Sequence, residues 1–200
     1  MDEKDIALIK DKLRSSSVGI AGLGGLGSNA AMALARSGIG RLVIVDFDEV
    51  EESNLNRQAY DLDQVGMRKT EALSLNIVKV NPHVNVTAFH LMLEPGNMAE
   101  PFSQVDVVIE ALDEAETKAR FIEEMAAAYP DKPIIAASGV AGNHGAERVR
   151  LRRSGDLHLV MDEQAPSCHD SIVLAPKVGL FASWQAALAL EILLEGLNAD

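Results

Sequence analysis

Ser17-Val-Gly-Ile-Ala-Gly-Leu-Gly-Gly-Leu-Gly27 is the stretch that decides the fold. Its first half is a short apolar run, which predicts a buried strand. Gly22, Gly24 and Gly27 then fill the positions of a G-x-G-x-x-G turn, and the Ala-rich run 25–37 predicts a helix. In such turns the glycines permit the tight bend, the close approach of a phosphate and the packing of the next helix. The N-terminus of that helix then points free N–H groups at the bound anion.

A second apolar strand, 41–46, ends in an acidic residue. Asp46 lies 24 positions after Gly22, near the spacing at which a carboxylate accepts hydrogen bonds from a ribose hydroxyl. A dehydrogenase would carry the same glycines and the same aspartate, so this unit predicts a nucleotide without fixing the reaction. The structural alternative is a tight glycine turn that binds nothing.

The composition is that of one globular domain, residues 1–200, with 48% hydrophobic and 24% charged residues. The net charge of −12 argues against a nucleic-acid partner. A single cysteine excludes an intrachain disulfide and a Cys-rich zinc site, so we expect no zinc. No signal peptide is visible at the acidic start, and polar residues interrupt the apolar run 178–194, so we expect a cytoplasmic protein that does not enter a membrane.

Strand and helix patterns alternate over the first two thirds of the chain. We expect helices at 2–14, within 61–80 and at 114–129, and further strands at 84–89, 105–110 and 132–138. This alternation predicts an α/β fold with a Rossmann-like, mostly parallel, doubly wound sheet. The segments 147–152 and 156–161 flank Ser154-Gly155, which predicts a hairpin and hence antiparallel strands at the C-terminal edge. A polar loop, 161–171, and a long helix opened by Pro176 complete the chain.

Six motifs occur in the order and spacing of the ThiF/MoeB/HesA family, the bacterial relatives of ubiquitin-activating enzymes. They are Gly22-Leu-Gly-Gly-Leu-Gly27, Val45-Asp-Phe-Asp48, Asn54-Leu-Asn-Arg-Gln58, Gly66-Met-Arg-Lys69, Asn81-Pro82 and Ala111-Leu-Asp113. The resemblance covers residues 17–196, and the Asn54–Gln58 block is more specific than the glycine turn. The short length resembles most the compact ThiF subgroup linked to thiamine biosynthesis.

The resemblance implies a homodimer that uses ATP and Mg²⁺ to adenylate the C-terminal carboxylate of a ubiquitin-like sulfur carrier ending in Gly-Gly. The roles that it implies are these: Gly24, Gly25, Leu26 and Gly27 line the phosphates, Asp46 holds the ribose, Asn54, Arg57 and Lys69 contact the phosphates, Asp113 helps to hold magnesium, and Asp48 lies beside the site. It also places Cys168 in the loop where family members carry a cysteine that forms a covalent adduct with the carrier.

The chemistry of adenylation agrees with these residue types. A carrier carboxylate is already ionised at neutral pH, so its attack on the α-phosphorus needs no general base. The obstacle is to bring an anion to a polyanion and to stabilise the departing pyrophosphate, which fixed cations and a metal achieve. Arg57, Lys69 and Asp113 supply those groups. For Arg57, the alternative is a surface ion pair with Asp61 or Asp63.

Two features depart from the family pattern. Many relatives bind zinc through two Cys-x-x-Cys pairs, which one cysteine cannot provide. Many also send an N-terminal arginine into the neighbouring subunit's ATP site, and Arg14 lies too close to Ser17 to match that position.

For Cys168 the alternative to a reactive role is that of an ordinary loop residue. His169 would lower the thiol pKa if its ring approached the sulfur, whereas His83, His90, His144 and His158 lack metal-ligand spacing.

Other functions remain open at this point. The chain could activate a carrier of the molybdopterin or cysteine pathway, with a cysteine desulfurase or a rhodanese as sulfur donor. It could also be a nucleotide-binding module without turnover, or an NAD-dependent oxidoreductase, although the latter leaves Asn54, Arg57, Lys69 and Asp113 unexplained. The last helix is apolar almost all round, which predicts a dimer surface. Its apolar residues are Val178, Leu180, Phe181, Trp184, Leu188, Leu190 and Leu194.

Overall fold

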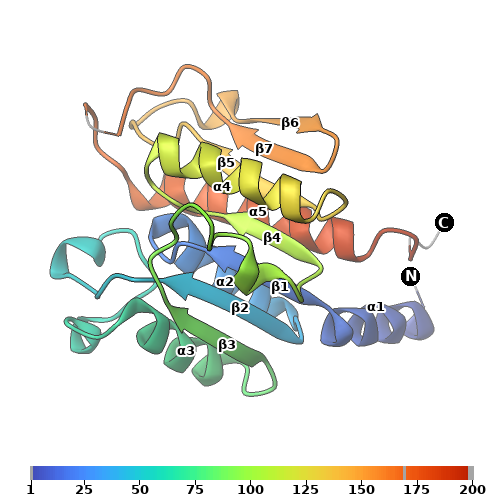
Figure 1. The fold of residues 1–200 in the computed structure, drawn as a ribbon. Coiled ribbons are helices and arrows are strands. Elements are labelled where there is room, and N and C mark those ends of the chain that lie inside the picture. Colours follow the sequence, from blue (N-terminus) through green and yellow to red (C-terminus); the bar gives the residue numbers. More distant parts are fainter. Residues whose placement is uncertain (1, 169, 198–200) are drawn as a thin grey trace.

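A computed structural model describes residues 2–168 and 170–197. Within them, seven strands form one sheet in the order β3-β2-β1-β4-β5-β7-β6 (Figure 1). The strands are β1 (Ser17–Ala21), β2 (Arg41–Asp46), β3 (Asn85–His90), β4 (Val107–Glu110), β5 (Ile134–Ser138), β6 (Arg150–Ser154) and β7 (Leu157–Met161). All the described pairings are parallel except that of β6 with β7. The predicted Rossmann-like, mostly parallel sheet is therefore confirmed, and its order reverses between β1 and β4, where such folds bind ligands.

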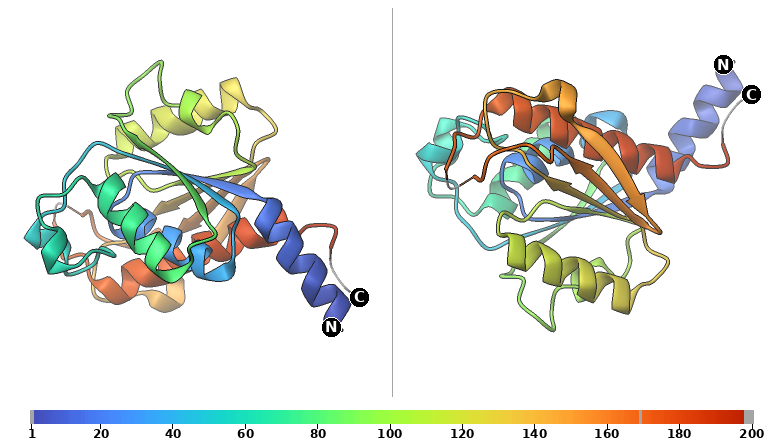
Figure 2. Two further views of the ribbon diagram at one scale, coloured as in Figure 1. Left: turned by 90° about the horizontal axis from the view of Figure 1, so that it is seen from below. Right: turned by 90° about the horizontal axis from the view of Figure 1, so that it is seen from above.

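Helices cover both faces of the sheet. The α-helices of the described residues are α1 (Glu3–Ser15), α2 (Gly25–Ser37), α3 (Lys69–Val80), α4 (Ala115–Ala128) and α5 (Ala175–Leu193). Figure 2 shows α2, α3 and α5 on one face and α4 on the other, while α1 extends away from the sheet. None of the helices in the described part of the chain is both long and apolar enough to cross a membrane.

The core consists of two clusters, one on each face of the sheet. The first contains Ile20, Ile44 and Phe181, which are fully buried between the sheet and the layer of α2, α3 and α5. The second contains Phe102 and Phe121, whose rings meet edge to face with their centroids 5.6 Å apart. Because both faces are covered, the central strands read as continuous apolar runs rather than alternating ones.

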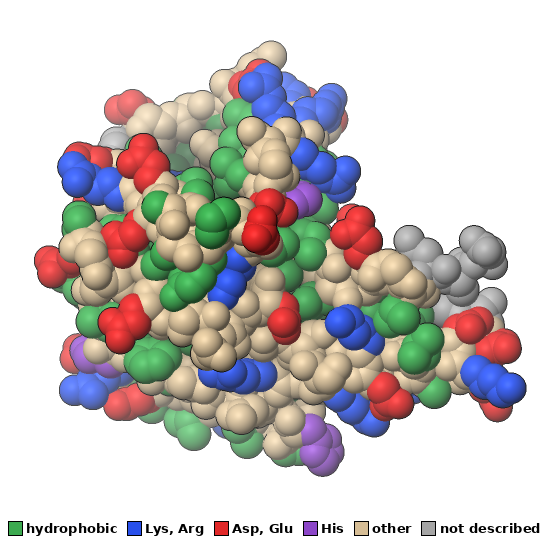
Figure 3. All heavy atoms as spheres, turned by 45° about the vertical axis from the view of Figure 1, so that its right-hand side comes forward, with side chains coloured by type: hydrophobic (Ala, Val, Ile, Leu, Met, Phe, Trp, Pro, Cys, Tyr) green, Lys and Arg blue, Asp and Glu red, His purple; other side chains and the backbone are tan. Residues whose placement is uncertain are grey.

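The C-terminal hairpin differs from its prediction in two ways. Glu147 and Arg148 belong to a 3-10 turn, Ala146–Arg148, so the first hairpin strand begins only at Arg150. Arg148 instead directs its guanidinium to the buried carboxylate of Asp162. The two strands form the predicted antiparallel pair, but only β6 lies at the edge, because β7 also pairs in parallel with β5. Side chains of Lys and Arg gather over this hairpin, at the top of Figure 3.

The last helix uses its apolar surface within the chain, which corrects the reason given for a dimer. Val178, Phe181 and Leu188 of α5 are at most 1% exposed, and Trp184 packs against the same core while partly buried. Leu180 is the exception, at 37% exposure. A helix that packs both on the sheet and against α2 needs apolar residues on more than one side, because neighbours contact it there. The homodimer stays a prediction without this support.

Candidate nucleotide-binding site

The turn between β1 and α2 requires glycine at its first and last positions. Gly22 has φ of +87°, and a methyl group on it would lie 2.7 Å from the carbonyl oxygen of Ala111. A methyl group on Gly27 would lie 1.9 Å from the carbonyl oxygen of Gly22. Either contact is impossible without moving the backbone. Gly24 immediately precedes α2 and has open space around it. Among the described residues, the one atom near a methyl group on Gly24 would be the Gln58 amide nitrogen, at 3.9 Å.

Asp46, at the end of β2, accepts hydrogen bonds on both carboxylate oxygens. One oxygen accepts from the Leu23 N–H at 2.6 Å and the other from the Asp48 N–H at 2.7 Å. Burial raises the pKa of Asp46, and the positive charge of Lys69 opposes that rise. Even without a nucleotide, the Asp46 side chain therefore holds the backbone of the glycine turn at Leu23. A carboxylate can accept about four hydrogen bonds, so lone pairs remain for ribose hydroxyls.

Asp48 forms an ion pair with Lys69, the first residue of α3. The Lys69 Nζ lies 2.6 Å from the Asp48 Oδ2. The lysine side chain is 7% exposed, whereas the aspartate side chain is 46% exposed. Asp48, whose role the sequence did not define, is thus the half-exposed partner of the predicted phosphate-binding lysine.

The Asn54–Gln58 motif lies over the glycine turn. Asn54 is buried and its Oδ1 accepts from the Glu51 N–H at 3.2 Å. Arg57 donates to the Ser53 carbonyl at 3.1 Å and to the Asn56 Oδ1 at 2.8 Å, so the alternative of an ion pair with Asp61 or Asp63 is not found. The Arg57 Cγ would lie 3.7 Å from a methyl group on Gly25. The aliphatic part of the Arg57 side chain therefore lies against the glycine turn, while its guanidinium is bound within the 53–56 segment.

Three residues that the sequence did not single out join this motif to the turn. The Ser28 Oγ donates to the Gly24 carbonyl at 2.6 Å and accepts from the Ala59 N–H at 3.0 Å. The Asn29 amide donates to the carbonyls of Gly25, at 2.7 Å, and Arg57, at 2.9 Å. The Tyr60 hydroxyl donates to the Leu23 carbonyl at 2.9 Å, and burial raises its pKa. A signal was available for two of them, because Ser28-Asn29 interrupts an otherwise apolar helix.

Asp113 follows β4 and is exposed, with its Oδ1 accepting from the Glu114 N–H at 2.9 Å. The strand end that leads to it lies beside the glycine turn, because the Ala111 N–H donates to the Ala21 carbonyl at 2.8 Å. Glu110, which precedes this turn, is fully buried beside Lys118 of α4. Burial raises the pKa of Glu110, and Lys118 opposes that rise.

The described residues contain no group of three or more His, Cys, Asp or Glu side chains that could hold a metal ion alone. A Mg²⁺ ion that accompanies a nucleotide takes one or two carboxylates and completes its shell with phosphates and water. The exposed Asp113 carboxylate fits such a role, whereas the structure offers no self-sufficient metal cage among those residues.

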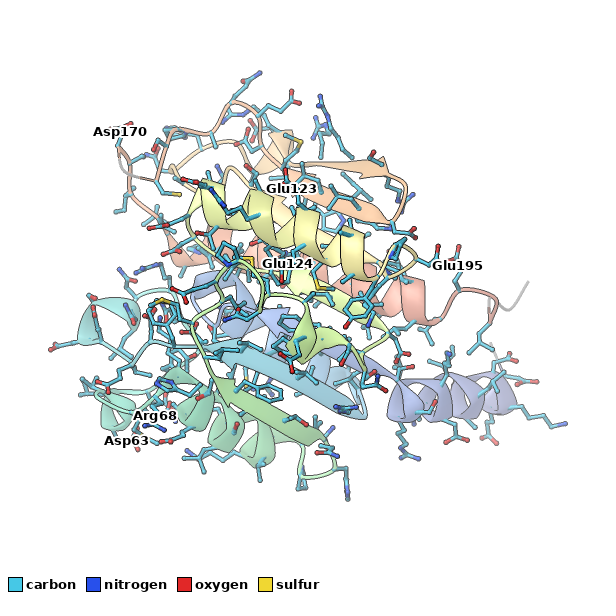
Figure 4. The ribbon with its side chains drawn as sticks, viewed as in Figure 1. Asp63, Arg68, Glu123, Glu124, Asp170 and Glu195 are labelled. Carbon is cyan, nitrogen blue, oxygen red and sulfur yellow. The ribbon has the colours of Figure 1, made fainter. Side chains whose placement is uncertain are left out.

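Cys168 is exposed and lies in a separate loop. That loop reaches the same end of the sheet as the glycine turn, at the left of Figure 1, and Figure 4 shows Asp170 near its outer end.

At the base of the Cys168 loop, the Asp162 carboxylate accepts from Arg148, at 3.2 Å, and from Lys177, at 3.0 Å. A depression of about 470 Å³ beside it is lined by residues 142–147 and by Leu174, Pro176, Lys177 and Leu180. The prediction for His169 falls outside the described residues.

The structure therefore brings most of the predicted residues to one place. Asp46, Asp48, Asn54, Arg57, Lys69 and Asp113 follow the carboxyl ends of β1, β2 and β4 or belong to the segments packed on them. Cys168 lies in the loop that follows β7, and β7 is on the other side of the switch point, beyond β5.

Comparison with known proteins identifies the family of this chain. Residues 4–199 match the model of the ThiF family. The chain is 33% identical over 201 residues to a protein from Kluyveromyces lactis, adenylyltransferase and sulfurtransferase UBA4. The aligned region covers 97% of this chain but only 45% of that relative. It is 30% identical to the molybdopterin-synthase adenylyltransferase of Escherichia coli, over 92% of this chain and 75% of that one.

Solved structures share the fold. Crystal structures of E. coli tRNA N6-threonylcarbamoyladenosine dehydratase, TcdA, align with TM-scores of 0.85 for the complex with AMP and 0.83 for the complex with ATP. Both are 24% identical to this chain and cover 96% of it, with 93% and 89% of their own chains aligned. The family match extends over almost the whole sequence, and the site geometry described above lies within it. This chain belongs to the ThiF family.

Proposed function

We propose that this domain is an ATP-dependent adenylyltransferase that activates the C-terminal Gly-Gly carboxylate of a ubiquitin-like sulfur carrier protein. The observation that carries the proposal is the packing of the Asn54–Gln58 motif over the glycine turn, with Lys69 paired to Asp48, whose N–H binds Asp46. A dehydrogenase has no growing pyrophosphate charge to neutralise, because hydride transfer breaks no bond to phosphorus. Relatives named as adenylyltransferases support the same kind of reaction.

The proposed reaction is a displacement at the α-phosphorus of ATP. A carboxylate oxygen of the carrier forms the new bond to phosphorus while the bond to the bridging oxygen of the β-phosphate breaks. The electron pair leaves with pyrophosphate, and the product is the acyl-adenylate. Asp46 accepts from the ribose, the N-terminus of α2 receives phosphate oxygens, and Asn54, Arg57 and Lys69 neutralise the charge that grows on pyrophosphate.

Asp113 is the proposed carboxylate ligand of the Mg²⁺ that accompanies ATP. When bound, the ion would supply positive charge to the phosphate oxygens. The other groups work by position and charge, because the carboxylate nucleophile is already ionised. Cys168 is proposed to act after adenylation, in capture or transfer of the activated carrier. Its loop lies at the same end of the sheet as the glycine turn (Figure 1), which is where this proposal puts the acyl-adenylate.

The carrier is proposed to be ThiS-like, for the thiazole of thiamine, in a cytoplasmic homodimer with a cysteine desulfurase or rhodanese as sulfur donor. A carrier of molybdopterin synthesis fits equally, because a relative is named for that pathway. Carrier-dependent pyrophosphate exchange with purified carriers of the thiamine, molybdopterin and cysteine pathways separates these substrates. The thiamine assignment predicts the highest kcat/KM for the thiamine carrier, and a higher value for another carrier would overturn it.

The Arg57→Ala variant tests the site. We expect carrier-dependent pyrophosphate exchange to fall by about 10²–10³-fold, as when other preorganised charge contacts are removed. Arg68→Ala is the matched control, because Arg68 is exposed and pairs only loosely with Glu71, at 3.6 Å. Its exchange rate should stay within twofold of the wild type. Equal rates in wild type and Arg57→Ala would remove Arg57 from the site.

Ligand-dependent stabilisation separates the nucleotide classes. A ligand that binds only the folded state raises the unfolding midpoint. ATP with Mg²⁺ should raise it and NAD should not. Stabilisation by NAD alone would favour the oxidoreductase, and stabilisation by ATP without exchange on any carrier would favour a binding module without turnover.

A further inference from the structure

The carboxyl end of β4 contains a buried ion pair that the proposed reaction does not use. Glu110 is the last residue of β4 and is 0% exposed. Its Oε1 lies 2.8 Å from the Nζ of Lys118, in the first half of α4. Its Oε2 is buried and has no hydrogen-bond partner among the described residues. An apolar pair would serve stability as well or better at such a position, so the pair calls for another explanation.

Both side chains bind the backbone of Leu112, the residue before Asp113. The Glu110 Oε1 accepts from the Leu112 N–H at 2.7 Å. The Lys118 Nζ donates to the Leu112 carbonyl at 2.8 Å. With its N–H and its carbonyl both bound, Leu112 has little freedom to rotate about φ and ψ. The direction in which the chain leaves it, toward Asp113, is thereby fixed.

The start of the same turn is fixed to the phosphate side of the site. The Ala111 N–H donates to the Ala21 carbonyl at 2.8 Å. The Ala111 carbonyl is the atom that excludes any side chain at Gly22. The turn from Glu110 to Asp113 is thus held between the glycine turn on one side and α4 on the other, while the Asp113 carboxylate remains exposed.

We propose that Glu110 and Lys118 are positioning residues, which hold Leu112 so that Asp113 presents its carboxylate to the metal–nucleotide complex. The inference rests on the proposed function, because it assigns Asp113 to that complex. Neither side chain touches the substrate in this account. Loss of the Glu110–Lys118 pair should therefore weaken the help that Mg²⁺ gives to ATP binding, and should leave metal-free nucleotide binding unchanged.

Lys118→Met is the decisive variant, measured by calorimetric titration of ATP into the full chain with Mg²⁺ and again with EDTA. We expect the factor by which Mg²⁺ tightens ATP binding to fall at least fivefold, while the affinity in EDTA stays within twofold of the wild type. Lys118→Arg should restore most of the Mg²⁺ effect, because it keeps a donor for both oxygens. Arg120→Met is the matched control, since Arg120 pairs with Glu116 at 2.8 Å on the exposed side of α4.

An unchanged Mg²⁺ effect in a folded Lys118→Met protein would overturn the inference. So would equal losses with Mg²⁺ and with EDTA, which a merely structural role predicts. If Lys118→Met does not fold, Glu110→Gln decides, because it keeps the shape and one acceptor while removing the charge; we expect a smaller loss of the Mg²⁺ effect. Failure of the proposed function looks different, since the wild type itself would then show no ATP binding that Mg²⁺ enhances.

Discussion

Two lysine–aspartate pairs lie at the carboxyl end of the sheet, and they differ in how completely the protein encloses them. Lys69 and Lys177 have the same side-chain exposure, 7%. The carboxylate partner of Lys69, Asp48, is 46% exposed, whereas that of Lys177, Asp162, is 0% exposed. Lys177 also donates to the carbonyls of Ala141, at 2.7 Å, and His144, at 3.2 Å.

The difference shows which lysine is free to change partners. Every donor of the Lys177 ammonium is used inside the protein, and Asp162 is shared with Arg148. Such a pair fixes structure: it joins the end of β7, the 141–144 segment and the start of α5 beneath the Cys168 loop. The bond described for the Lys69 ammonium is the one to a half-exposed carboxylate. This half-open pair supports the proposal that a phosphate of ATP replaces or shares the carboxylate partner of Lys69.

Asp162→Ala should give the largest effect. It leaves the buried Lys177 charge without its carboxylate, which typically costs about 3–5 kcal/mol in the free energy of unfolding. Urea denaturation measures this loss. Glu163→Ala is the matched control, because Glu163 pairs with Arg152 on the surface, and such a pair contributes about 1 kcal/mol at most. Similar losses in the two variants would mean that the two acidic residues are equally dispensable.

Lys69→Ala should act on activity instead. We expect carrier-dependent pyrophosphate exchange to fall by about 10²–10³-fold, with a smaller loss of stability than Asp162→Ala causes. Asp48→Ala frees the lysine and should leave the ATP affinity equal to or tighter than that of the wild type. If Asp48→Ala weakens ATP binding as much as Lys69→Ala does, the comparison fails, because the pair would then act as one fixed unit.

Acid should affect the enclosed pair selectively. The hydrogen bond from Arg148, with help from Lys177, lowers the pKa of Asp162 from 3.8 to about 2. A carboxyl group with a lowered pKa in the folded state stabilises the protein above its unfolded pKa, and this contribution disappears as the pH falls toward the folded value. The free energy of unfolding should thus fall more steeply from pH 4 to pH 2 in wild type than in Asp162→Asn. Parallel curves would show that Asp162 is not the group involved.

Cys168→Ala should have the smallest effect on the folded protein. Its side chain is exposed, so the free energy of unfolding should change by no more than about 0.5 kcal/mol. Adenylation should survive, because attack by a carboxylate on ATP needs no thiol. Intact-mass spectrometry without reductant, after incubation with ATP and carrier, should show a carrier adduct in wild type only. Equal sulfur transfer by both proteins would make Cys168 an ordinary loop residue.

The sequence was sufficient for the central sheet because local pattern and tertiary structure agree there. Residues that are close in the sequence determine the glycine turn and the buried strands. They also determine the start of α5, which Pro176 marks. The predicted start of β6, at residue 147, was wrong because Arg148 forms an ion pair with Asp162, which is distant in the sequence. The dimer argument from α5 failed for a similar reason, since hydropathy does not say which neighbour buries an apolar face. Glu110 carried a signal, an acid ending an apolar strand, but its partner Lys118 becomes visible only in three dimensions.

Pyrophosphate exchange into ATP tests the central claim most directly when the carrier is offered in two forms. One form has a free C-terminal Gly-Gly carboxylate, and the other has the same sequence ending in an amide. The account predicts exchange with the first form and none with the second, because only a carboxylate oxygen can attack the α-phosphorus and yield an acyl-adenylate. Exchange with the amidated carrier, or none with any carrier while the folded protein still binds ATP, would contradict it.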